Sequence, residues 1–217
     1  MKQVFAPGCA LMIYKPELGE KLLKYLNKDS NNIEIHLTCC QHELNLPDNT
    51  QVINVCAGCD RRYRSLYEGI STISLWEILA ESKDFPFPDY NGREMTIHDP
   101  CPVRSEARVH DSVRKLLKKM NIKIIETKNN RGKSICCGDS LHGKVSKEIV
   151  KAAMMKRAAE MPCEDVVVYC VSCIKSMHIG GKKPWHLIDL LFNEESDPQT
   201  YDTAEWHREL QEFIDQH

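Results

Sequence analysis

Cysteine is the residue most able to do chemistry in this chain, which has eleven cysteines among 217 residues. Ten of them form two sets with the same order: a single cysteine, an adjacent pair and a Cys-x-x-Cys motif. The sets are Cys9, Cys39, Cys40, Cys56 and Cys59, and then Cys101, Cys136, Cys137, Cys170 and Cys173. No apolar signal region follows Met1, so we expect a cytoplasmic protein. In a reducing compartment, cysteines at this density indicate metal binding or redox chemistry rather than disulfides.

The spacing within each set restricts the kind of metal centre. A Cys-x-x-Cys motif lets two thiolates from one turn reach a common metal or cluster, and a single cysteine on a neighbouring strand can complete the shell. Adjacent cysteines point to opposite faces of an extended chain, so each pair must lie in a turn or serve two irons. Five thiolates exceed the four that tetrahedral zinc accepts. A multi-iron cluster therefore fits each set better than one zinc ion.

The residues around the cysteines also repeat, which predicts a tandem duplication. Apolar segments 51–55 and 166–169 lead into the two Cys-x-x-Cys motifs, and the proline-bearing segment 82–93 separates the two sets. The predicted parts are a first cysteine-rich repeat at 1–85, a second at 94–193 and a C-terminal helical extension at 194–217. Each repeat has the size of a common small domain.

Short apolar runs precede the cysteines and helical patterns lie between these runs. Strand-like runs at 33–38 and 95–98 end just before Cys39 and Cys101, and apolar residues recur with helical spacing over 109–120. Strands that alternate with helices form parallel α/β units, in which ligands bind beyond the carboxyl ends of the strands. We therefore predict an α/β fold, a duplicated Rossmann-like unit with cysteine clusters at the C-terminal ends of its strands and two lobes that face each other.

The second set resembles a known family. Cys101-x34-Cys136-Cys137-Gly138-x31-Cys170-x-x-Cys173, together with the segment His98-Asp99-Pro100-Cys101, is similar to the CCG, or cysteine-rich, domain. This domain occurs twice in one of the subunits of heterodisulfide reductase and in related subunits of glycolate and lactate oxidation systems. The resemblance implies that the five cysteines of a set ligate a non-cubane [4Fe-4S] cluster, at which a disulfide is bound and split. One or two such clusters are expected.

The first set departs from this pattern. Gln41 replaces the glycine after the pair, and 15 residues separate the pair from Cys-x-x-Cys where the second set has 32. The missing stretch corresponds to a predicted helix over 144–161. All five cysteines persist, so we expect a second cluster, with zinc as the alternative in this repeat.

Histidines near the cysteines are candidates for proton transfer. We name His98 and His142 as candidate catalytic residues, because a histidine beside the cluster could supply a proton during disulfide cleavage. The alternative role is a hydrogen bond to the metal ligands.

Charge and missing motifs narrow the function. The 29 basic and 31 acidic residues give a net charge of −2, which argues against nucleic acid as the main partner, and no apolar run is long enough for a membrane span. No GxGxxG motif indicates a nicotinamide or flavin site, so electrons must come from another protein.

We expect an iron-sulfur oxidoreductase subunit that reduces or forms a small-molecule disulfide. Its expected partner is an electron-donating iron-sulfur or flavin subunit. Two alternatives remain: an electron-relay subunit of a dehydrogenase complex, and a zinc-stabilised interaction module without redox activity.

Overall fold

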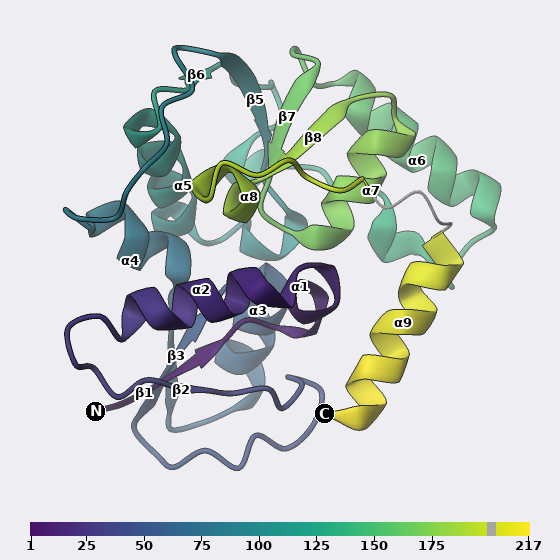
Figure 1. Cartoon of the computed structure of the whole chain (residues 1–217). Helices are drawn as coiled ribbons and strands as arrows, with labels where there is room; N and C mark the ends of the chain where they lie inside the picture. Colours follow the sequence, from purple (N-terminus) through teal and green to yellow (C-terminus); the bar gives the residue numbers. More distant parts are fainter. Residues whose placement is uncertain (199–202) are drawn as a thin grey trace. The chain divides into compact units, whose positions relative to one another are not determined.

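A computed structural model describes residues 1–198 and 203–217 (Figure 1). The chain divides into two compact units. Unit 1 consists of residues 1–78 and 206–217, and unit 2 consists of residues 79–205. Each unit contains a four-stranded parallel sheet with helices between its strands, which confirms the predicted duplicated α/β fold.

Unit 1 has the strand order β2-β1-β3-β4. Its elements are β1 (Lys2–Ala6), α1 (Cys9–Tyr14), α2 (Pro16–Leu26), β2 (Glu34–Ile35), β3 (Thr50–Asn54), α3 (Ala57–Leu66), β4 (Ile70–Ser74), the first part of α4 (Leu75–Glu81) and most of α9 (Thr203–Gln216). The predicted strand over 33–38 is therefore only two residues long.

Unit 2 has the equivalent order β6-β5-β7-β8. Its elements after α4 are β5 (Glu94–His98), η1 (Cys101–Val103), α5 (Ala107–Lys119), β6 (Lys123–Ile124), η2 (Arg131–Lys133), η3 (Asp139–Leu141), α6 (Lys147–Ala159), β7 (Asp165–Val168), α7 (Val171–Ile179), β8 (Lys183–His186) and α8 (Leu187–Leu191). The predicted helix over 144–161 is α6, and no helix lies between Cys40 and Cys56 of unit 1.

The sheets form because each inner strand carries apolar residues that helices can cover on both faces. Val166, Val167 and Val168 of β7 are fully buried, as is Val52 of β3. Each inner strand is thus held in register by backbone pairing and by burial. This rigid sheet fixes where the loops after its strands begin.

Helix α9 packs on unit 1. Ile214 belongs to the same buried cluster as Val4, Val52 and Tyr63, and Trp206 is fully buried. The predicted C-terminal extension at 194–217 includes residues 199–202, which lie outside the described residues. Within the described parts of the chain, no helix is both long enough and apolar enough to cross a membrane.

Candidate metal centre

The carboxyl ends of the two inner strands deliver three of the five cysteines in each unit. Cys101 lies three residues beyond the end of β5, as Cys9 lies three residues beyond the end of β1. Cys170 is the N-cap of α7 and Cys173 lies in its first turn; Cys56 and Cys59 hold the same positions in α3. Since parallel strands end at one edge of a sheet, these side chains meet.

The adjacent pairs join this group from the loops after the short outer strands. In unit 2, hydrogen bonds link the sulfurs in the order Cys101, Cys136, Cys137, Cys173 and Cys170. In unit 1 the order is Cys9, Cys39, Cys40, Cys59 and Cys56. The two orders are equivalent position by position. The structure thus brings together all five predicted cysteines of each set, while Cys163 lies in the turn before β7.

The first cysteine of each pair has the most strongly lowered pKa of its set. Hydrogen bonds from Cys40 and Cys9 lower the pKa of Cys39 to about 2. Hydrogen bonds from Cys101 and Cys137 likewise hold the pKa of Cys136 far below its usual range. The hydrogen bond to Cys39 raises the pKa of Cys40 to about 12. In both sets, the hydrogen bonds therefore favour ionisation of the thiol at the same position.

Backbone and hydroxyl groups support these sulfurs. The Gly138 N–H donates to Cys136 Sγ at 3.4 Å, and Ser140 Oγ lies 3.0 Å from the same sulfur. Cys56 accepts a hydrogen bond from Cys59, which lowers the pKa of Cys56 to about 7 together with backbone N–H donors in the first turn of α3. A helix N-terminus favours thiolates in general.

A buried hydrogen-bond network around Asp99 ties the cysteine loops of unit 2 together. Its carboxylate accepts two bonds from Arg114, at 3.1 and 2.9 Å, one from the Tyr169 hydroxyl at 2.6 Å and one from the Arg131 N–H at 2.7 Å. Ser134 Oγ donates to the Asp99 carbonyl. Burial opposes ionisation of Asp99, but the bonds from Arg114 outweigh it and lower the pKa of this carboxyl.

This network connects residues that flank three of the cysteine positions, since Asp99 precedes Cys101, Ser134 precedes Cys136 and Tyr169 precedes Cys170. Nothing in the cysteine pattern indicates a role for Ser134 or Tyr169, or for Arg114 at this site. Only the segment His98-Asp99-Pro100-Cys101 indicates a role for Asp99 at this site, because it places a carboxylate beside a candidate ligand.

The two predicted catalytic histidines have different positions. A ring nitrogen of His98 and the sulfurs of Cys137 and Cys173 all lie within 4.8 Å of one another. His98 is fully buried, and burial lowers its pKa to about 3. His142 follows η3, is partly exposed and is not a member of that group.

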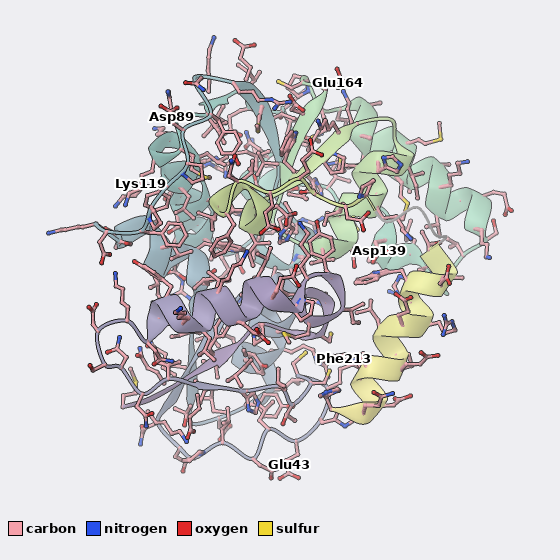
Figure 2. All side chains as sticks on the ribbon, viewed as in Figure 1. Glu43, Asp89, Lys119, Asp139, Glu164 and Phe213 are labelled. Atoms are coloured by element: carbon pink, nitrogen blue, oxygen red, sulfur yellow. The ribbon has the colours of Figure 1, made fainter. Side chains whose placement is uncertain are left out.

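The donor atoms fit a metal or iron-sulfur cofactor. Each unit offers five sulfurs linked in a chain of hydrogen bonds, and thiolate ligands suit zinc, copper(I) and iron-sulfur clusters. In unit 1 a cavity of about 10 Å³ is lined by Cys9, Cys39, Cys40 and Cys59, and by Phe213 of α9, which is labelled in Figure 2. A larger cavity of about 370 Å³ in unit 2 is lined by residues such as His178 and Lys182 but by no described cysteine, so we do not assign it to this centre.

The residue that follows the cysteine pair differs between the two units, and different helices pack on the two turns. Gly138 has φ +107°, and a Cβ there would lie 2.9 Å from the backbone nitrogen of Met154 in α6. Unit 1 has no such helix between its pair and its Cys-x-x-Cys motif, and the exposed Gln41 stands in place of the glycine. There, the His217 carbonyl at the end of α9 accepts a hydrogen bond from the Cys39 N–H, and His42 Nε2 lies 2.8 Å from the Ile214 carbonyl.

Fold and site define the class: an α/β protein with clustered thiols at the carboxyl ends of its strands. Residues 95–178, which lie in unit 2, match the family model of the CCG cysteine-rich domain. No curated protein matches the chain. The family and the clustered cysteines indicate a metal or iron-sulfur cofactor and a role related to redox chemistry.

Proposed function

We propose that this chain is an iron-sulfur oxidoreductase subunit that resembles the cysteine-rich subunit of heterodisulfide reductase and reduces or forms a small-molecule disulfide. The observation that carries the proposal is the identical order of sulfur contacts in the two units, with five thiols in each. A structural zinc ion uses only four ligands and leaves one thiol of each set unexplained.

The ligands of the unit 2 centre would be Cys101, Cys136, Cys137, Cys170 and Cys173. Those of the unit 1 centre would be Cys9, Cys39, Cys40, Cys56 and Cys59. When bound, a non-cubane [4Fe-4S] cluster supplies single-electron transfer and an electrophilic iron. The chain's own residues hold the sulfurs: helix N-termini support the Cys-x-x-Cys motifs, and the Asp99 network fixes the loops of unit 2.

The reaction requires electrons from a partner. Reduction of a disulfide breaks one S–S bond, takes up two electrons and two protons, and yields two thiols. We propose an iron-sulfur or flavin subunit as the electron donor and a low-molecular-weight disulfide as the substrate. His142, which is partly exposed, remains a candidate proton donor, whereas the buried His98 is poorly suited to exchange protons with solvent.

Anaerobic turnover tests this proposal. The protein is reconstituted with iron and sulfide, reduced with a strong one-electron donor and given a panel of small disulfides. The parent should release thiols, Cys137→Ser and Cys40→Ser should each be slower, and Cys163→Ser serves as the matched control with the parental rate.

Other outcomes identify the alternatives. Loss of rate only in Cys137→Ser would assign the chemistry to unit 2 and give unit 1 a structural role, with zinc as its candidate metal. Rapid electron exchange with a carrier protein without turnover of any disulfide would contradict the proposal and favour an electron relay. Zinc alone in both units would favour an interaction module.

A further inference from the structure

His98 is held in one orientation by an arginine from a different element. It is the last residue of β5, and its side chain is fully buried. Arg157 of α6 donates from Nε to His98 Nδ1 at 3.2 Å. The other ring nitrogen, Nε2, is buried and has no hydrogen-bond partner among the described residues.

The contact with Arg157 determines which ring nitrogen carries the proton. A guanidinium has N–H donors and no acceptor, so Nδ1 must accept and the proton of the neutral ring must be on Nε2. Arg157 is itself anchored, because it donates to Glu160 Oε2 at 2.6 Å and to the Asn129 carbonyl at 2.8 Å. The imidazole therefore cannot change tautomer without breaking this arrangement.

The proton on Nε2 excludes one role for His98 and favours another. A protonated ring nitrogen has no lone pair with which to bind a metal, so His98 is not a sixth ligand despite its place beside Cys137 and Cys173. The imidazole ring lies beside the sulfurs of Cys137 and Cys173, and a buried, unpartnered Nε2–H can donate a hydrogen bond to a sulfur of the centre that comes within its reach.

We propose that His98, positioned by Arg157, is a permanent N–H donor to the sulfurs of the unit 2 centre and raises the reduction potential of that centre. The inference rests on the proposed iron-sulfur function. Hydrogen bonds to cluster sulfurs stabilise the more negative, reduced state, and so they shift the potential upward.

Unit 1 has no counterpart of His98 or Arg157 at the equivalent positions, and among the described residues its buried, unpartnered histidine nitrogen beside the cysteines is Nε2 of His36, which follows β2 and lines the small cavity. The residue equivalent to His98 is Ala6, which ends β1 three residues before Cys9. Unit 1 also has no helix equivalent to α6 between its pair and its Cys-x-x-Cys motif, and therefore no residue equivalent to Arg157. The two centres would consequently differ in the donors around their sulfurs, and therefore in their potentials.

The test is a redox titration of the reconstituted full chain, followed by electron paramagnetic resonance. His98→Ala introduces the alanine that unit 1 has at the equivalent position. It should lower one of the two reduction potentials by about 59 mV for one electron, which is a factor of about ten in the reduction equilibrium. His98→Gln keeps an N–H donor and should retain a potential close to the parental one. His110→Ala is the control, because His110 is another buried histidine of unit 2 whose Nε2 has no described partner.

Two results would overturn the inference. One is an unchanged potential in His98→Ala with parental iron content. The other is loss of iron from unit 2 in both His98 variants, which would make His98 a ligand. A parent protein that takes up no iron would instead refute the proposed function, so the two failures are distinguishable.

Discussion

Asp99 shows how a residue outside the cysteine sets can determine the geometry of the loops that carry them. The carboxylate accepts four hydrogen bonds while it is buried, and its partners come from α5, η2 and the residue before Cys170. A buried carboxylate is stable only when such bonds compensate for lost hydration. Removing one partner should therefore disturb both the fold of unit 2 and its metal centre.

Tyr169→Phe tests this network. The variant loses a hydrogen bond to a charged group, which should lower the free energy of unfolding by about 1.5–3 kcal/mol. Chemical denaturation of the metal-loaded protein measures the change. Tyr90→Phe is the matched control, since the Tyr90 hydroxyl donates to the neutral Leu190 carbonyl and its loss should cost only about 0.5–1.5 kcal/mol. An equal effect of the two substitutions would contradict the special role of Asp99.

Cys170→Ser tests the ligand assignment. Metal binding to ligands from several loops contributes to folding, so loss of a ligand should lower both the metal content and the melting temperature. Cys163→Ser should change neither by a comparable amount, because Cys163 lies outside the sulfur group. Metal analysis and thermal melting of the two variants provide the comparison. Parental values for Cys170→Ser would remove Cys170 from the ligand set.

The candidate site was predictable to the extent that it depends on spacing along the chain. Cys56 and Cys59, or Cys170 and Cys173, are recognisable because one helical turn brings both to a common centre. The partners of Asp99 were not predictable in this way, since Arg114 and Tyr169 reach it from 15 and 70 residues away. Likewise, the sequence drew attention to His98 but not to Arg157, which determines its tautomer.

Helix α6 explains why one turn needs glycine and the other does not. At Gly138 a side chain would have to occupy space already filled by Met154 and Ala153 of α6, in a backbone conformation with φ +107°. In unit 1, no helix lies between the pair and the Cys-x-x-Cys motif, and Gln41 is exposed. The replacement of glycine and the loss of the helix, which the sequence presents as two separate departures, are thus one structural change.

Reciprocal substitutions test this explanation. Gly138→Gln should destabilise unit 2 by about 1–3 kcal/mol or more, because it combines overpacking with an unfavourable positive φ. Gln41→Gly should cost much less, since the Gln41 side chain is exposed. Denaturant unfolding and metal content should both be measured. Equal tolerance of the two changes would show that α6 does not impose the glycine.

Helix α9 contacts the turn after the pair in unit 1, as α6 contacts the corresponding turn in unit 2. An amphipathic helix was predictable from the spacing of Trp206, Leu210, Phe213 and Ile214. Its docking site was not predictable, because an apolar stripe does not specify which surface covers it. The structure resolves this by placing Ile214 in one cluster with Cys39 and Cys40.

Ile214→Asp should loosen α9 from unit 1, because it places a charge in a buried apolar cluster. Cys39 and Cys40 should then react faster with an alkylating reagent in the metal-free protein, while Cys137 in unit 2 keeps its parental rate. Peptide mass spectrometry measures each rate. Gln211→Asp adds the same charge at an exposed position of α9 and serves as the control. Unchanged labelling of Cys39 and Cys40 in Ile214→Asp would mean that α9 does not cover them.

The two units share a strand order and a sulfur arrangement, yet they surround their sulfurs differently. Unit 2 has the buried network around Asp99 and the contact between His98 and Arg157. In unit 1, the positions equivalent to His98, Asp99 and Pro100 hold Ala6, Pro7 and Gly8. Gly8 itself is closely packed, since a Cβ there would lie 3.0 Å from Cys56 Cβ. The two units thus share their cysteine arrangement, while the surroundings of the cysteines differ.

Metal content after anaerobic purification and reconstitution with iron and sulfide decides whether the two sulfur groups are iron-sulfur centres. Iron, acid-labile sulfide and zinc are measured together in the same sample. We predict about four irons with matching sulfide for each occupied unit, with unit 2 always occupied. Zinc alone, without iron or sulfide in either unit, would contradict the iron-sulfur assignment.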